Sequence, residues 1–236
     1  MTLGKQNNLT DKERYHWYQN AQNLFWKSPI WEVQTRFDEQ FNEQLLEEIY
    51  SIGKDIVLGN DRSPKNSIWD YSRPNLDILK QEIIDIVEKT IIQEIPEIRM
   101  LNLQGCEHFM GWINVREPGE RLEVHGHTES AIAATYYLRA KEGCGDIVLF
   151  DTADAIDWDR NDISGSPYIR ARRFKPVEGR LIFFPSYVLH GVKGNGGNTL
   201  RVSLSTDFNY KLTDDSKDKL VLSSWVDSMI KIKELI

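Results

Sequence analysis

The spacing of apolar residues changes near residue 97, and this change constrains the fold more than any other feature. Before it, residues 38–56 and 73–95 repeat apolar side chains at helical steps. After it come short apolar runs such as "AIAATYYLR" and "GRLIFFPSYVLH", separated by clusters of Gly, Pro, Asp and Asn. Short strands with such punctuation are typical of a β-sandwich or a small barrel. We therefore expect an α+β chain, mainly β, with helices first and strands second.

The N-terminal part is expected to support this β core. Residues 23–36 alternate apolar and polar side chains, which indicates a strand. In the segment 38–56, Phe41, Leu45 and Ile49 share one face of an amphipathic helix. Asn75 is a plausible N-cap for the second helix. We expect one domain over residues 1–236, made of these parts: strand and support helices 1–96, β core 97–210, C-terminal helix 211–236.

Composition excludes several classes of protein. The net charge of −7 and the absence of a basic run argue against nucleic-acid binding. Cys106 and Cys144 form no CxxC pair, and two cysteines make no disulfide framework, so a reduced, cytoplasmic compartment is expected. No run of about 18 apolar residues is present, so we expect no membrane span. The sequence does not define the oligomeric state, and a homodimer is compatible with it.

A group of metal-ligand residue types precedes the run "AIAATYYL". The stretch "RLEVHGHTES" places His125, His127 and Glu129 at alternate positions, on one face of an extended strand. His190 ends an apolar strand that the fold could bring alongside. Positions 125 and 129 lie about 13 Å apart in a strand, so both cannot bind one ion. The spacing predicts a metal site and leaves two ligand sets open: His125–His127–His190 or His127–Glu129–His190.

Arg201 lies on the next apolar strand, "TLRVSLSTDF". Alternation puts Arg201 and Ser203 on one face and Val202 on the other. An inward arginine in a β core is costly unless an anion pairs with it. The pattern therefore indicates a carboxylate-bearing cosubstrate held by the guanidinium fork, with a surface arginine on an edge strand as the alternative.

Together these stretches resemble a known family. "GWINVREPGERLEVHGHTESAIAATYYL", "GDIVLFD", "GRLIFFPSYVLHGVKGN" and "RVSLSTDFN" are similar to the 2-oxoglutarate/Fe(II) oxygenases found in marine phages and bacteria. The resemblance covers about residues 23–210. It implies a double-stranded β-helix, or jelly roll, with Fe(II), 2-oxoglutarate and O₂. It also implies decarboxylation of 2-oxoglutarate to succinate while a C–H bond of a small-molecule or peptide substrate is oxidised, usually by hydroxylation.

The resemblance also implies roles for individual residues. Its His-x-His pairing favours the iron ligands His125, His127 and His190, with Glu129 as the alternative to His125. The family's arginine on the strand after the last ligand binds the distal carboxylate of 2-oxoglutarate, and this position is held here by Arg201. The expected helpers and pocket-lining residues are Ser203, Tyr137 and Asn114.

Two other readings share some of these features. "GERLEVHGH" has the glycine, five residues and HxH of a first cupin motif, although Ala131 and Ile132 stand where that motif has its later glutamate. A cupin enzyme would use the same metal without 2-oxoglutarate. A non-catalytic β-sandwich binding module would use neither. Dependence of turnover on 2-oxoglutarate separates the oxygenase from both.

Overall fold

A computed structural model describes residues 15–18, 28–53, 67–94, 106–127, 130–150 and 171–210. The chain divides into two compact units, residues 1–77 with 109–208, and residues 78–108 with 209–236. The single-domain organisation expected from the sequence therefore stays a prediction. The expected C-terminal helix, 211–236, lies outside the described residues.

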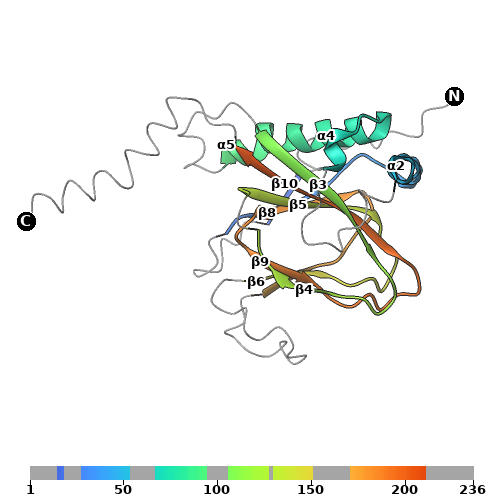
Figure 1. Cartoon of the computed structure of the whole chain (residues 1–236). Coiled ribbons are helices and arrows are strands. Elements are labelled where there is room, and N and C mark those ends of the chain that lie inside the picture. The colour runs from blue at the N-terminus through green and yellow to red at the C-terminus, as the bar shows by residue number, and fades with distance from the viewer. Residues whose placement is uncertain are drawn as a thin grey trace, which may run out of the picture. The chain divides into compact units, whose positions relative to one another are not determined.

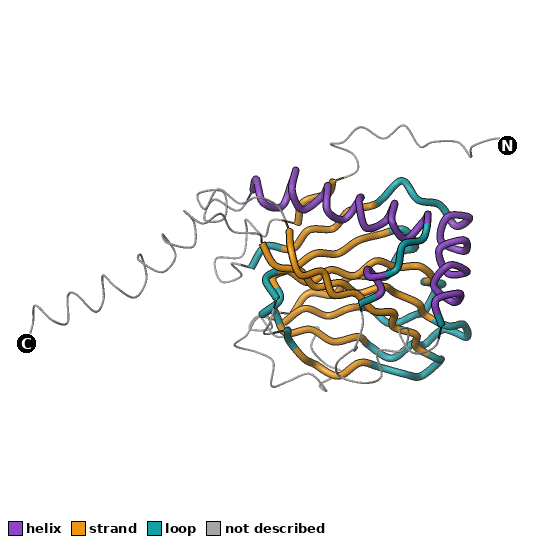
Figure 2. The backbone as a smooth tube through the Cα atoms, turned by 45° about the horizontal axis from the view of Figure 1, so that its top comes forward, coloured by secondary structure: helices purple, strands orange, loops and turns teal. Residues whose placement is uncertain are grey.

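Two antiparallel sheets dominate the first unit. The larger has the strand order β1-β2-β8-β5-β10-β3 and the smaller β4-β9-β6-β7. Figures 1 and 2 show the two sheets as facing layers. This arrangement is a double-stranded β-helix, which confirms the expected fold class. The strands are β1 (Tyr15–Tyr18), β2 (Ile30–Gln34), β3 (Cys106–Arg116), β4 (Leu122–His125), β5 (Ile132–Arg139), β6 (Ile147–Phe150), β7 (Ala171–Phe174), β8 (Arg180–Pro185), β9 (Leu189–Val192) and β10 (Arg201–Tyr210).

A hydrophobic core draws side chains from both sheets. Strands β2, β5 and β8 contribute from the larger sheet, and β6 and β7 from the smaller. Burying a large apolar side chain contributes about 1.5–3 kcal/mol, so this core holds the sheets together. Its buried members are Ile30, Ala133, Tyr137, Ile147, Leu149, Phe174, Ile182, Phe184 and Val188.

Helix α2 (Glu39–Ile52) covers part of the opposite face of β5. Asp38 caps its first turn by accepting a hydrogen bond from the Phe41 N–H at 2.9 Å. The Tyr136 hydroxyl donates to Asn42 of this helix at 2.6 Å. Because successive strand residues face opposite ways, Tyr136 meets the helix while Tyr137 enters the core. The helix is thus on the side of the sheet away from the core.

The second predicted helix begins differently from the expectation. Helix α4 (Pro74–Ile86) starts at Pro74, and a π-helical turn η2 (Val87–Ile91) and α5 (Ile92–Glu94) continue it. Asn75 is inside the helix, so its prediction as the N-cap was wrong. The Glu48 carboxylate of α2 instead accepts from the Asn75 and Leu76 N–H groups at 3.0 and 3.1 Å. Proline suits a first helical position because that position needs no N–H donor.

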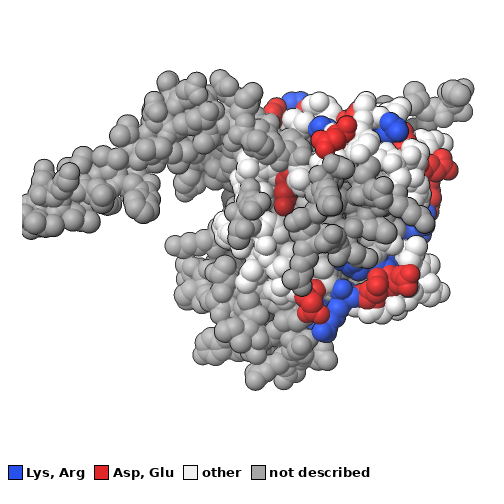
Figure 3. Space-filling model, in the orientation of Figure 1, with Lys and Arg blue, Asp and Glu red and all other residues white. Residues whose placement is uncertain are grey.

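The described surface mixes both signs of charge. In Figure 3, basic side chains lie next to acidic ones on the face in view. Arg139 pairs with Glu43 at 2.6 Å and Lys141 with Glu39 at 2.9 Å. Exposed pairs of this kind each contribute at most about 1 kcal/mol. Across the described ranges, every helix is too short or too polar to span a membrane.

Candidate active site

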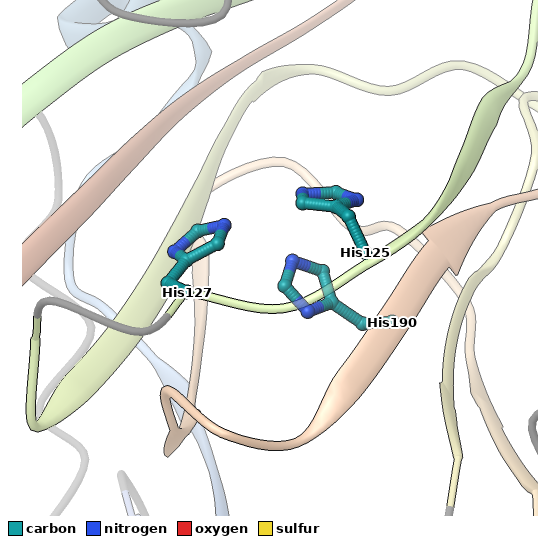
Figure 4. Close-up of side chains that lie close together, drawn as sticks. All are labelled: His125, His127 and His190. Atoms are coloured by element: carbon teal, nitrogen blue, oxygen red, sulfur yellow. The ribbon is translucent and has the colours of Figure 1, made fainter.

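Three histidines meet at one edge of the smaller sheet. His125 ends β4, His127 follows two positions later, and His190 lies in β9, directly opposite His125 in the antiparallel pairing. One ring nitrogen from each lies within 4.8 Å of the others. Figure 4 shows the three rings grouped around one point. The fold thus brings together the His-x-His pair and the distant histidine that the sequence singled out.

The hydrogen bonds of these rings fix which nitrogen faces the centre. His125 Nδ1 lies 2.9 Å from the Glu123 carbonyl oxygen, and His190 Nδ1 lies 3.0 Å from that of Val188. His127 Nδ1 lies 2.8 Å from Asp207 Oδ1. These oxygens are acceptors, so each Nδ1 carries the proton and donates. Each Nε2 is left with a free lone pair, as a metal ligand requires.

Burial keeps the imidazoles of His125 and His190 neutral. Removal from water and, to a smaller extent, the neighbouring His125 lower the pKa of His190 to about 3, against the opposing effect of the Val188 hydrogen bond. Burial also lowers the pKa of His125, opposed by its bond to Glu123. Neutral imidazole is the metal-binding form, so these two side chains are in that form near neutral pH. Three imidazoles on one side of a shared point suit a divalent first-row metal such as Fe(II).

Glu129, the alternative ligand to His125, lies outside the described residues. Within the described ranges, one cluster of three or more His, Cys, Asp or Glu side chains could hold a metal, and it consists of His125, His127 and His190. The choice between His125 and Glu129 as the third ligand therefore stays a prediction.

Arg201 is deeply buried at the start of β10. Its side chain is 2% exposed, and Nη1 donates to Ser203 Oγ at 3.2 Å. Its Nε and Nη2 have no hydrogen-bond partner in the described part of the chain, and neither does the buried Tyr137 hydroxyl. The guanidinium carbon lies 5.1 Å from the centre of the Tyr137 ring. Burial raises the pKa of that tyrosine to about 12, so it stays a protonated donor.

These donors define a place for an anion. A buried guanidinium with unmet N–H groups is costly, and a carboxylate would satisfy it through charge-assisted hydrogen bonds. The Tyr137 hydroxyl, next to it, supplies a further donor. The fold thus brings Arg201, Ser203 and Tyr137 together, and their binding of a keto-acid carboxylate stays a prediction.

Asn114 and Trp112 lie on one face of β3, which neighbours β10 in the sheet. The Asn114 amide donates to Ser205 Oγ at 2.9 Å, and the Trp112 ring centre lies 5.7 Å from that of His127. The structure therefore sets Asn114 against the β10 strand that also carries Arg201.

Sequence reasoning missed Arg116 and Asp207. Arg116, two positions after Asn114, is 8% exposed, and burial lowers its pKa, with the Glu120 charge opposing and the Arg201 charge adding to the shift. It is therefore a second cation close to the anion site. Asp207 shares a face of β10 with Arg201 by strand alternation. The two-residue period of a strand was the signal available for both residues. It leads from Ser203 to Asp207 on β10 and from Asn114 to Arg116 on β3.

Comparison with known proteins covers the part of the chain that holds these residues. A family model for 2OG-Fe(II) oxygenases matches residues 110–207, a span that contains each residue discussed above from Trp112 to Asp207. No curated protein sequence matches the chain.

Three solved structures are similar to this chain. A prolyl-4-hydroxylase of Pseudomonas putida is 18% identical over 78% of this chain and 88% of its own, with a TM-score of 0.50. HygX of Streptomyces hygroscopicus, with nickel and 2-oxoglutarate bound, is 10% identical over 76% and 81%, with a TM-score of 0.47. SnoK, a non-heme alpha-ketoglutarate-dependent carbocyclase from nogalamycin biosynthesis, is 14% identical over 77% and 79%, with a TM-score of 0.46. At these identities the likeness describes the fold.

The fold is a jelly roll that carries three clustered histidines and a buried arginine. Residues 110–207 match the family model for 2OG-Fe(II) oxygenases, and this match supports a 2-oxoglutarate-dependent dioxygenase that uses Fe(II), 2-oxoglutarate and O₂. This favours the oxygenase over the cupin and binding-module readings.

Proposed function

We propose that the chain hydroxylates a C–H bond of a small-molecule or peptide substrate, with His125, His127 and His190 as its iron ligands. The observation that carries this proposal is a pairing within one jelly roll: three histidine ring nitrogens within 4.8 Å of one another, and a buried guanidinium with unmet donors. The first suits Fe(II), and the second suits the far end of 2-oxoglutarate.

When bound, iron and 2-oxoglutarate would supply the activation of dioxygen, in which the keto acid becomes succinate and CO₂ and the substrate C–H bond is oxidised. The chain's own residues position these partners. Arg201 would hold the distal carboxylate through Nε and Nη2, with the Tyr137 hydroxyl as a further donor and Ser203 bracing Nη1. Arg116 would add a second positive charge that attracts the dianion.

The wall of the pocket contributes orientation and excludes water. Trp112 lies against His127, so its ring would limit access of water to that side of the metal. Asn114, held by Ser205, would present its remaining amide oxygen or N–H toward the keto acid. These groups are fixed by β3 and β10, two neighbouring strands, and strand positions hold side chains more accurately than loops.

We also infer that the enzyme works in a reducing, cytoplasmic compartment. Cys144 is a buried free thiol, which supports this inference.

The test is turnover of 2-oxoglutarate. The purified protein is incubated with Fe(II), O₂ and 2-oxoglutarate, and succinate is measured alone and with panels of amino acids, peptides and small metabolites. We expect iron-dependent succinate formation in the parent and none in His190→Ala. Iron binding without any 2-oxoglutarate binding or consumption would instead support the cupin-type alternative.

A further inference from the structure

The three histidines differ in what accepts their Nδ1 protons. His125 and His190 each donate to a backbone carbonyl two positions earlier, a neutral and local acceptor. His127 donates to a carboxylate that lies 80 positions away in the chain, Asp207 of β10. Both oxygens are near the ring nitrogen, at 2.8 and 2.7 Å. A neutral acceptor would be enough to fix the tautomer, so the carboxylate adds something more.

The pair is well shielded and rigidly held. The His127 and Asp207 side chains are 15% and 16% exposed. The His127 backbone N–H donates to the Ser186 carbonyl at 3.0 Å, which ties the residue to the turn before β9. Asp207 lies opposite Ala133 in the β10–β5 ladder. Away from bulk water, a carboxylate on Nδ1 draws the proton toward itself and makes Nε2 a stronger donor to a metal.

We propose that Asp207 supplies, through His127, the negative charge that a carboxylate ligand supplies in sites with two histidines and one carboxylate. This inference rests on the proposed function, in which His127 is an iron ligand. The carboxylate is then hydrogen-bonded to a metal ligand instead of being bound to the metal itself. The three-histidine set with Asp207 and a set of two histidines and one carboxylate therefore give the metal a similar overall charge. Asp207 is a positioning residue, because it acts through His127.

One face of strand β10 then contributes to both the anion site and the metal site. Its first residue, Arg201, faces the anion site, and Asp207 faces the metal ligand. Ser203 and Ser205 fill the positions between, bonded to Arg201 and Asn114 respectively. The strand thus carries a positive charge at the keto-acid end and a negative charge at the metal end.

The test compares metal affinity in two variants. Asp207→Asn keeps an oxygen that can accept the His127 proton and removes the charge, while Asp207→Ala removes both. Anaerobic titration with Fe(II), and with Co(II) followed by its visible spectrum, gives the dissociation constants. We expect Asp207→Asn to bind metal about 10–100-fold more weakly than the parent, the usual loss when such a partner of a ligand is changed. The control is Glu43→Gln, which removes a charge on α2 at the opposite face of the sheet and should bind metal as the parent does.

The outcomes separate the inference from the proposed function. Equal affinity of Asp207→Asn and parent, with a loss only in Asp207→Ala, would overturn the charge role and leave a purely geometric one. No metal binding by the parent would contradict the proposed function and the inference with it. A second test is rescue: His127→Asp in the Asp207→Asn background places a carboxylate on the metal and should restore Fe(II) affinity toward that of the parent. An affinity no higher than that of Asp207→Asn would overturn the charge role.

Discussion

The histidine cluster at the edge of the smaller sheet and the arginine on the larger sheet differ in how their hydrogen bonds are met. Each histidine Nδ1 has an acceptor within the fold. Arg201 Nε and Nη2 and the Tyr137 hydroxyl have none among the described residues. The hydrogen-bond donors of the proposed metal site all have acceptors within the fold, whereas these donors of the proposed anion site lack them among the described residues.

This difference gives the histidine cluster and Arg201 different free-energy costs in the ligand-free protein. A buried polar group without a partner costs about 1–3 kcal/mol, so the fold stores an unfavourable term at Arg201 that an incoming carboxylate removes. At the histidines the second partners are already in place, which leaves Nε2 oriented before a metal arrives. Substitutions at the two ends should therefore separate metal binding from keto-acid binding.

Loss of a ligand should give the largest effect. We expect His190→Ala to lose measurable Fe(II) binding, because two imidazoles remain and the buried position cannot be filled by the new side chain. Anaerobic metal titration checks this. Tyr187→Phe, in the exposed turn before β9, is the control and should bind Fe(II) as the parent does. Undiminished binding in His190→Ala would mean that the metal is held elsewhere.

Arg201→Met should weaken 2-oxoglutarate binding without affecting the metal site. We expect Fe(II) binding to remain and 2-oxoglutarate affinity to fall about 10- to 100-fold, the value of hydrogen bonds to a charged group. The free energy of unfolding of the ligand-free protein should stay the same or rise, because an apolar chain replaces a buried cation with unmet donors. Calorimetric titration and urea unfolding measure the two quantities. Arg139→Met, whose arginine pairs with Glu43 at the surface, should leave 2-oxoglutarate affinity unchanged, and an equal fall in both variants would refute the assignment.

Acid should weaken the histidine end. The folded pKa of His190 is about 3 against an ordinary value of 6.5. Between these pH values His190 is protonated in the unfolded chain and neutral in the folded protein. The free energy of unfolding therefore falls as the pH drops from 6.5 toward 3. Urea unfolding of the metal-free protein across this range should show a steeper loss in the parent than in His190→Ala. Identical slopes would show that His190 titrates normally in the folded protein.

Tyr137→Phe should have the smallest effect. Removing one neutral donor costs about 0.5–1.5 kcal/mol, so 2-oxoglutarate affinity should fall a few-fold, as calorimetric titration would show. The stability of the ligand-free protein should hardly change, because the hydroxyl has no acceptor to lose. A large loss of stability instead would show that the hydroxyl is bonded within the free fold.

Much of this could be read from sequence because strand alternation is local. The two-residue period joined Arg201 to Ser203 and His125 to His127, and apolar spacing gave helix α2. Contacts between distant segments were not readable: Glu48 caps a helix 27 positions later, which displaced Asn75 from its expected role. Asp207 was missed because a carboxylate becomes informative only once the fold sets it beside His127.

The most direct test of the account is a crystal structure of the protein with Mn(II), as an inert substitute for Fe(II), and 2-oxoglutarate. We expect the metal on Nε2 of His125, His127 and His190, with the distal carboxylate on Arg201. Metal bound by Glu129 in place of His125, or a keto acid that leaves Arg201 without an anion, would contradict it.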